Sequence, residues 1–341
     1  MSKSKLTVLM PVFNNMPYIK TAIKSVINQN FKNWEMIISD DQSTDGSIEF
    51  LKKIKHKKIQ IFFQKKNLGI YGNLKFLNSK AKTSIIKILC ADDKLTFNSL
   101  ENIYSFMKKF KSCKIMTCYD QNQKQIYKNK HPGSITNFKD YGMNLTTQNK
   151  DYIKFTPKSS MIGFFAFGNL CGNLSRVTYR KVKDGKNPTF DPKYTYAGDY
   201  NAWARFSQKY GLYVIKKKLA YVRMHPKRST FYLNKKNDLY PQLSKIYFFL
   251  LKNINKKHHA YLRKNMLLSD LPQRIPAYIK FLIFGEIKLA NKVFFGLPLK
   301  ISILECFMYA VFYIFRNNSL NKLNNHYRNH AINIINDLSK E

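Results

Sequence analysis

Strand-like and helix-like segments alternate along the first 110 residues of this chain. Leu6–Val12 is an apolar run typical of a buried strand, and Pro17–Gln29 carries apolar side chains at helical spacing. Further strands are expected at Trp34–Ser39, Ile59–Gln64 and Ile85–Cys90, and further helices at Ser43–Lys55, Tyr71–Lys82 and Leu95–Lys108. Because short turns join these alternating segments, the pattern favours an α/β fold with a parallel, doubly wound sheet.

The pattern is less regular beyond this stretch. Residues 114–160 are polar and rich in turn residues, so we expect loops that cross the sheet edge there. The later segments are a glycine-rich apolar stretch at Gly163–Asn173, a short strand or helix start at Val177–Lys181, a helix at Asp199–Tyr210, and strands at Tyr213–Ile215 and Leu219–Val222. A domain boundary is placed near Lys235, which leaves residues 1–235 as the α/β domain and residues 236–341 as a second region.

The second region is helical in pattern, basic, and apolar in patches. The patches are Leu243–Leu251, Ile275–Phe284, Val293–Leu299 and Ile301–Phe315. Ile301–Phe315 is shorter than the roughly 20 residues that span a bilayer. Lysines punctuate the apolar segments, which favours helices lying in the plane of an anionic membrane surface. A helical bundle packed on the α/β domain is the alternative.

The chain carries a large positive charge. Lysine and arginine number 59 against 20 acidic residues, which gives a formal net charge of +39. Such a charge predicts attraction to anionic partners, including phosphorylated ligands, phospholipid and nucleic acid. A solvated lysine-rich surface without any such partner explains the same number. The basic residues are spread along the whole chain and do not form a separate tail.

The cysteines and the first residues bear on the cellular compartment. The five cysteines show no CxxC or Cys/His spacing typical of metal sites, so reduced thiols in the cytoplasm are expected. The N-terminal residues lead into a strand without the apolar region of a signal peptide. We therefore predict a cytoplasmic protein, and the lysine-punctuated apolar segments of the second region favour a peripheral position on the cytoplasmic face of a membrane.

Two adjacent acidic pairs follow predicted strands. Asp40-Asp41 comes after the second strand and Asp92-Asp93 after the fourth. The carboxyl ends of parallel strands meet at one edge of a sheet, where α/β proteins bind ligands. Neither GxGxxG nor GxxxxGK[ST] occurs, which argues against a dinucleotide oxidoreductase and a P-loop enzyme. The two pairs indicate a site for a divalent metal and a nucleotide.

Four segments follow one another in a fixed order: Thr7–Asn14, Ile37–Ser47, Asn67–Gly69 and Ala91–Asp93. Together they resemble the family 2 glycosyltransferases of bacterial surface-polysaccharide synthesis. The resemblance covers roughly residues 5–235 and implies a GT-A fold, a Rossmann-like mixed sheet with helices on both faces. It also implies an inverting transfer of sugar from a nucleotide-diphosphate sugar to a glycan or polyprenyl-linked acceptor.

The resemblance assigns a nucleotide-binding role to seven residues. They are Pro11, Val12, Phe13, Asn14, Asp41, Asn67 and Asp92. Asp41 would accept a hydrogen bond from the base, since an ionised carboxylate is an acceptor-only group. Its neighbour Asp40 can instead stabilise a turn. The family usually has glycine where this chain has Gln42, which we expect to alter the turn but not to remove the carboxylate.

The resemblance also implies the residues that act in catalysis. Asp93 would hold a Mg²⁺ or Mn²⁺ ion at the diphosphate, with Asp92 on the ribose; either aspartate can also cap the following helix. Asp199 would be the general base that takes the proton of the acceptor hydroxyl, although aspartate at a helix start is commonly a cap. Arg223 and His225 resemble the family's element near the diphosphate, and Arg180 falls in a stretch resembling the acceptor side.

Two other functions compete with glycosyl transfer. A nucleic-acid-binding protein would account for the charge, but the sequence lacks helix-turn-helix, zinc-finger and RNP signatures, and no specific nucleic-acid partner is expected. A sugar nucleotidyltransferase of similar fold would need a glycine-rich basic phosphate loop near the N-terminus, which the segment 11–16 does not supply. The sequence does not name the donor sugar, its nucleotide or the acceptor.

Overall fold

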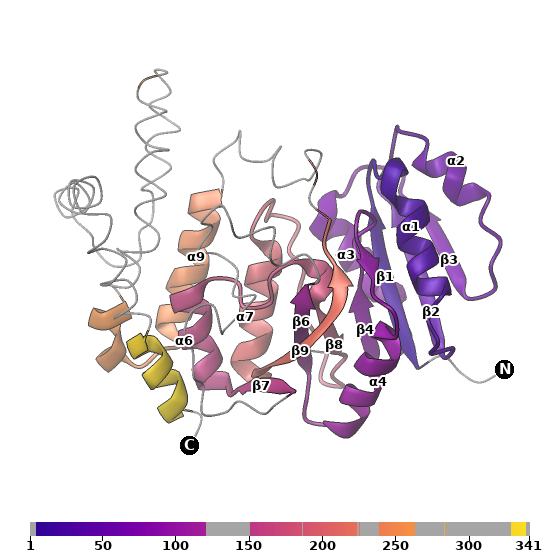
Figure 1. The fold of residues 1–341 in the computed structure, drawn as a ribbon. Coiled ribbons are helices and arrows are strands. Elements are labelled where there is room, and N and C mark those ends of the chain that lie inside the picture. The colour runs from indigo at the N-terminus through magenta and orange to yellow at the C-terminus, as the bar shows by residue number, and fades with distance from the viewer. Residues whose placement is uncertain are drawn as a thin grey trace.

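The structure is a computed structural model of the 341-residue chain. It describes residues 5–120, 151–185, 187–223, 225, 239–262, 283 and 329–338. A single mixed sheet runs through the molecule. Helices α6, α7 and α9 lie at one end of Figure 1, and strands β1, β2 and β3 lie at the other.

The first half of the sheet is parallel. It contains β3 (Ile59–Phe63), β2 (Trp34–Asp40), β1 (Leu6–Val12) and β4 (Ile85–Ile88), in that spatial order. The connecting helices are α1 (Met16–Ile27), α2 (Ser47–Lys52) and α3 (Gly69–Lys80), and α4 (Ser99–Lys109) follows β4. All four predicted strands and the helices between them are confirmed in this half.

The second half of the sheet is mixed. Strand β8 (Thr178–Arg180) runs antiparallel to β4 and to β6 (Ile115–Asp120). Strand β9 (Leu212–Tyr221) runs parallel to β6 and pairs antiparallel with β5 (Lys94–Leu95) and β7 (Tyr152–Phe155). The alternation of the first 110 residues therefore predicts parallel pairing only for the first half. The mixed sheet implied by the family resemblance is confirmed.

One correction concerns β9. The two strands expected at Tyr213–Ile215 and Leu219–Val222 are one continuous strand. The lysines between them, Lys216 to Lys218, interrupt the apolar pattern but not the strand, and Lys217 and Lys218 are exposed. A solvent-facing stretch of an antiparallel strand tolerates such residues.

The sheet separates two apolar cores because successive strand residues point to opposite faces. On β1, Leu6, Val8 and Met10 pack in one core, which includes buried residues of α1 and α4. Leu9 packs in the other core, with α3, α6 (Pro157–Phe167) and α7 (Gly198–Tyr210). Both faces of β1, β2 and β4 are therefore buried, which explains their near-continuous apolar sequences, whereas the edge strand β3 is partly exposed.

Helix α9 (Leu239–Lys252) of the C-terminal region packs against α6 and α7. Its buried side chains Ile246 and Leu250 belong to the same core as Trp203 of α7. Residues 329–338 form a further helix, and Ile332 and Ile335 join this core too (Figure 1). The described parts of the C-terminal region therefore pack on the α/β domain, as the helical-bundle alternative predicts.

Several predictions for this region fall outside the described residues. The boundary near Lys235 does, and so do the apolar segments 275–284, 293–299 and 301–315, apart from Ile283. Within the described part of the chain, no helix is both long enough and apolar enough to cross a bilayer.

Candidate active site

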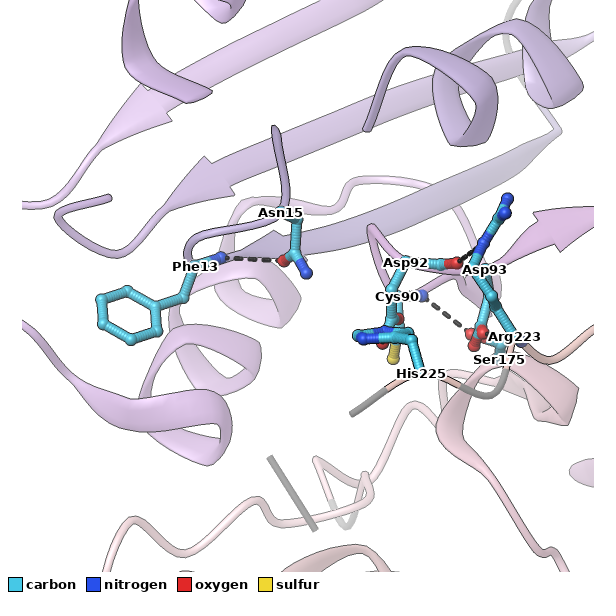
Figure 2. Close-up of polar contacts among 8 residues, drawn as sticks. All are labelled: Phe13, Asn15, Cys90, Asp92, Asp93, Ser175, Arg223 and His225. Atoms are coloured by element: carbon cyan, nitrogen blue, oxygen red, sulfur yellow. Dashed lines mark hydrogen bonds and ion pairs between the residues drawn. The ribbon is translucent and has the colours of Figure 1, made fainter. Parts of the chain in front are cut away.

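The loop after β1 carries the first group of predicted residues. Pro11 and Val12 are the last two residues of β1 and are buried, so their side chains belong to the strand and its core. Phe13 and Asn14 lie beyond the strand. The ring of Phe13 is 49% exposed and projects from this loop (Figure 2). Of these four residues, Phe13 and Asn14 are the exposed ones.

The side chains of Asn14 and Asp40 both accept hydrogen bonds from the turn that follows β2. Asn14 adopts a positive φ of 53° and accepts a hydrogen bond from the Thr44 backbone N–H at 2.8 Å. Asp40 accepts from the backbone N–H and the hydroxyl of Ser43, at 2.9 and 2.6 Å. The turn role considered for Asp40 is therefore confirmed, which leaves Asp41 as the carboxylate of this pair for a ligand.

Asp41 is buried at the carboxyl end of β2. Its Oδ1 accepts from the Leu68 backbone N–H at 2.7 Å, and the Asn67 side chain donates to the Asp41 carbonyl at 3.1 Å. Burial raises the pKa of Asp41, while the backbone N–H groups of Leu68 and Gly69 oppose this. The predicted residues Asp41 and Asn67 are thus in contact.

Gln42 takes the backbone conformation that glycine adopts without cost. Its φ is +65°, in the left-handed region, and its side chain donates to the Lys65 carbonyl at 2.7 Å. A residue with a Cβ in this region is strained by about 1 kcal/mol. Gln42 thus stands in a left-handed turn, and the Asp41 carboxylate is present next to it, as expected.

Cys90, Asp92 and Asp93 form a compact cluster just after β4 (Figure 2). One side-chain ligand atom from each lies within 4.8 Å of the other two. Asp93 is buried and its Oδ1 accepts from the Arg223 backbone N–H at 2.9 Å. Carboxylate oxygens are the ligands that Mg²⁺ and Mn²⁺ prefer, so this donor set fits the predicted divalent cation.

Arg223 and His225 close one side of this cluster. The Nε2 atom of His225 lies 3.1 Å from Oδ2 of Asp92, and Nε of Arg223 donates to the Asp92 carbonyl at 3.0 Å. Both side chains lie against the ring of Tyr18, at 4.5 Å between the rings for His225 and 4.7 Å for Arg223. The structure therefore brings Asp92, Asp93, Arg223 and His225 together, as predicted.

A buried lysine lies behind the cluster. Lys87 on β4 has no exposed surface, and its ammonium donates to the Ser175 carbonyl at 2.5 Å. Burial lowers the pKa of Lys87, and the nearby groups Cys118, Cys90 and Asp93 oppose that shift. Because Asp93 interacts with this side chain, Lys87 compensates part of the cost of burying a carboxylate.

Asp199 occupies the second position of α7 and is partly buried. Its carboxylate accepts from the Tyr200 backbone N–H at 2.7 Å, the Asn169 amide at 3.2 Å and the Tyr71 hydroxyl at 3.4 Å. These donors are all neutral. Burial raises the pKa of Asp199 from 3.8 to about 6, and the three hydrogen bonds only partly oppose it. A carboxylate with such a pKa is suited to accept a proton near neutral pH.

One short segment links Asp199 to the acidic cluster. The Asn169 amide donates to Asp199, and the Ser175 hydroxyl accepts from the Cys90 backbone N–H at 2.8 Å. Six extended residues span about 20 Å, which is an upper limit for the distance between these two anchors. The segment is folded, since the Gly172 N–H returns to the Asn169 carbonyl at 3.0 Å, so the true separation is shorter.

Arg180 lies away from the acidic cluster of Asp92 and Asp93. In the register of β8 it pairs with Ile85, the first residue of β4, whereas Asp92 and Asp93 follow the last. Its guanidinium donates to the Met107 carbonyl at 2.5 Å, near the end of α4. The predicted role of Arg180 at the diphosphate or acceptor does not fit this position, because antiparallel β8 carries it to the opposite end of β4.

Sequence reasoning missed four residues that build the site. They are Tyr18, Tyr71, Asn169 and Ser175. Tyr71 and Asn169 contact Asp199 from positions far away in the sequence, and no local pattern marks either. The only available signal was their place: Asn169 lies in the glycine-rich stretch, and Tyr71 begins a predicted helix just after the Asn67–Gly69 segment.

Comparisons with known proteins agree with this arrangement. Residues 7–169 match the model of glycosyl transferase family 2. An uncharacterized glycosyltransferase from Haemophilus influenzae is 35% identical over 109 residues, 31% of this chain and 44% of that protein. The putative teichuronic acid biosynthesis glycosyltransferase TuaG from Bacillus subtilis is 31% identical over 113 residues, 33% of this chain and 44% of that protein. The match spans less than half the length of each relative.

Solved structures extend the likeness further along the chain. S. aureus TarS aligns with a TM-score of 0.59 and 15% identity, over 91% of this chain and 55% of that chain. A structure of TarS residues 1–349 in complex with UDP aligns with a TM-score of 0.50 and 13% identity, over 85% of this chain and 90% of that chain. Such low identity bears on the fold alone. Residues 7–169 therefore resemble glycosyl transferase family 2, and the described α/β part has the GT-A fold.

Proposed function

We propose that this protein is an inverting glycosyltransferase that uses a nucleotide-diphosphate sugar and a divalent metal ion. One observation carries the proposal. The acidic cluster after β4 and the raised-pKa carboxylate of Asp199 are tied together by the single short segment Asn169–Ser175. A donor site and a base within reach of each other are what one displacement at a sugar carbon requires.

The nucleotide would bind at the ends of β1 and β2. The Asp41 carboxylate would accept a hydrogen bond from an N–H of the base, a contact that suits uracil and guanine alike. The exposed ring of Phe13 offers an apolar surface for the base, and Asp92 would contact the ribose. The TarS complex with UDP supports a uridine nucleotide as the first to test.

Asp93, with Asp92 and Cys90 beside it, would hold Mg²⁺ or Mn²⁺ next to the diphosphate. When bound, the ion neutralises negative charge that grows on the leaving phosphate. Arg223 and His225 would donate hydrogen bonds to phosphate oxygens from the side where they already contact Asp92. Two cationic or polar donors there would also orient the diphosphate.

Asp199 would act as the general base. Its carboxylate takes the proton of the acceptor hydroxyl as that oxygen bonds to the sugar C1 and the bond from C1 to the phosphate oxygen breaks. Attack from the side opposite the leaving group inverts the configuration at C1. Asn169 and Tyr71 hold the carboxylate in place during this step.

The acceptor would be a glycan or a polyprenyl-linked sugar, and the pathway surface-polysaccharide synthesis of the capsule or O-antigen type. The teichuronic acid assignment of TuaG supports this class of product. The net charge of +39 supports work at an anionic membrane surface, where such acceptors are held, on the cytoplasmic face.

A screen of nucleotide sugars tests the proposal. The full chain is incubated with uridine and guanosine diphosphate sugars, Mn²⁺ and lipid-linked acceptors, and release of nucleoside diphosphate is measured. We expect turnover with at least one donor, its loss with EDTA, and its return with added Mn²⁺. Asp93→Asn should abolish turnover and the Mn²⁺-dependent part of UDP or GDP binding measured by calorimetry.

Glu101→Gln is the matched control, because it removes an exposed carboxylate at the start of α4. It should keep turnover and nucleotide binding. Turnover that survives in Asp93→Asn would overturn the metal role of Asp93. A wild-type chain that neither binds nor cleaves any donor would overturn the function itself.

A further inference from the structure

Helix α7, which carries Asp199, begins without a capping side chain of its own. Its N-cap residue is Ala197, which offers no side-chain acceptor. The first backbone N–H groups of any helix need a partner from outside the helix. Without such a partner, the start of α7 would be less ordered. Asp199 lies only two residues after Ala197, so its position would be affected directly.

Gln242 of α9 accepts from the N-cap residue of α7 and from the residue that precedes it. Its Oε1 accepts from the backbone N–H groups of Tyr196 and Ala197, at 3.0 and 3.1 Å. Its Nε2 donates to the hydroxyl of Thr195 at 2.8 Å. One amide therefore contacts three successive residues, and it is only 9% exposed, so water competes weakly for these bonds.

The same turn is held from the other side by Tyr71 of α3. The Tyr71 hydroxyl donates to the Tyr196 carbonyl at 2.8 Å and lies 3.4 Å from Oδ1 of Asp199. Gly198 makes this approach possible, because a Cβ there would lie 2.6 Å from the Tyr71 ring. The turn before Asp199 is thus clamped between α3 and α9.

Helix α9 is itself well anchored. Ile246 and Leu250 are fully buried in the core shared with α6 and α7. Near its end, the guanidinium of Arg205 on α7 lies 4.1 Å from the ring centre of Phe249. Gln242 therefore reaches the turn from a fixed helix, which is the condition for a side chain to hold another residue in position.

We propose that Gln242 is a positioning residue for the transfer reaction, and that the C-terminal region completes the active site by holding the turn that orients Asp199. The inference rests on the proposed role of Asp199 as general base. A small displacement of a reacting group can cost about 100-fold in rate. Gln242 acts through the backbone of α7 and not on the substrate, so its loss should lower kcat without weakening donor binding.

Three variants test the proposal in the full chain. Gln242→Met keeps the length of the side chain but removes the acceptor and the donor. Gln242→Glu keeps the acceptor, and the Thr195 hydroxyl can turn to donate to it. Gln208→Met is the control, since Gln208 on α7 bonds Asn253, just past the end of α9, in a second polar contact remote from Asp199.

We expect kcat of Gln242→Met to fall between about 10- and 100-fold with the donor KM within about threefold of wild type. Gln242→Glu should restore kcat to within about threefold, and Gln208→Met should match wild type. Hydrogen exchange gives a readout independent of turnover: the amides of Tyr196 and Ala197 should exchange faster in Gln242→Met alone. Gln242→Asn, whose amide is one methylene too short, replaces Gln242→Met if that variant does not fold.

The outcomes distinguish a failure of the positioning role of Gln242 from a failure of the proposed function. Faster exchange with unchanged kcat in Gln242→Met would show a helix cap with no role in positioning, and it would overturn the inference. A loss of kcat in the Glu variant equal to that in the Met variant would also overturn it. Inactivity of the wild type toward every donor would instead refute the proposed function, and the positioning role of Gln242 with it.

Discussion

Replacement of Asp199 by asparagine should make the protein more stable while it removes activity. The Asp199 carboxylate is partly buried among neutral donors, and its pKa is raised from 3.8 to about 6. Each pKa unit corresponds to 1.36 kcal/mol, so the charged form costs the fold about 3 kcal/mol at neutral pH. Asparagine has nearly the same shape and carries no charge, so this cost disappears in Asp199→Asn.

The free energy of unfolding of Asp199→Asn should rise by less than the full 3 kcal/mol, because the asparagine amide carries its own hydrogen-bond donors. Both carboxylate oxygens of Asp199 accept hydrogen bonds, one from the Tyr200 N–H and one from the Asn169 amide. An asparagine NH₂ group must face one of these donors, which costs about 1 kcal/mol. The net stabilisation is then about 2 kcal/mol. With about 2.1 cal/mol/K of unfolding entropy per residue, 341 residues give a rise in Tm of about 3 °C.

The stability difference between Asp199→Asn and wild type should increase as pH rises. A carboxyl group with a raised pKa in the folded state is harmless below its unfolded value of 3.8. It destabilises the fold progressively as pH rises from 3.8 to about 6. The difference in Tm between Asp199→Asn and wild type should therefore be near zero at pH 4, grow up to about pH 6, and stay constant from pH 7 to 8.

Scanning calorimetry at several pH values measures this difference, and nucleotide release measures the expected loss of about 100-fold or more in kcat. Glu101→Gln again serves as the control, since neutralising this exposed carboxylate should change Tm little. A Tm difference that is equal at pH 4 and pH 8 would refute the reasoning, because it would not arise from ionisation of Asp199. A destabilised variant at pH 8 would refute it as well.

Two further substitutions test other parts of the site. Gly198→Ala should lower both kcat and stability, the latter by about 1–3 kcal/mol, because the added Cβ would lie 2.6 Å from the ring of Tyr71; kinetics and calorimetry check this, and an unchanged variant would show that the ring moves freely. His225→Ala should weaken Mn²⁺ binding in a calorimetric titration by about tenfold or more, because Asp92 loses the ring that orients it at 3.1 Å; unchanged affinity would exclude that role.

The sequence could predict which residues meet in the proposed donor half of the site, because the signals for them are local. The carboxyl ends of β2 and β4 follow from apolar runs, and each run ends in an acidic pair. Parallel pairing then brings the two pairs to one edge of the sheet. Even the choice between Asp40 and Asp41 had a local basis, since Asp40 bonds Ser43 only three residues away.

The proposed acceptor half could not be predicted in the same way, because the contacts around Asp199 join residues that are distant in sequence. Tyr71 and Asp199 are separated by 128 positions, and Ser175 and Cys90 by 85. Such contacts depend on how antiparallel strands and later helices pack, which no periodic pattern records. Arg180 illustrates the consequence: its position near the glycine-rich stretch suggested the acceptor side, but antiparallel β8 carries it to the opposite end of β4.

Helix α9 follows the predicted domain boundary but packs into the core of the α/β domain. A shift in composition near Lys235 suggested two separate units, yet Ile246 and Leu250 of α9 lie in the same core as Trp203 of α7. Gln242 then reaches from that helix to the turn before Asp199. Because one face of α9 completes the core and one of its amides caps α7, removing the helix would expose apolar surface and free the proposed base together. We therefore expect the stability of the chain and the proposed catalysis to depend on the same C-terminal helix.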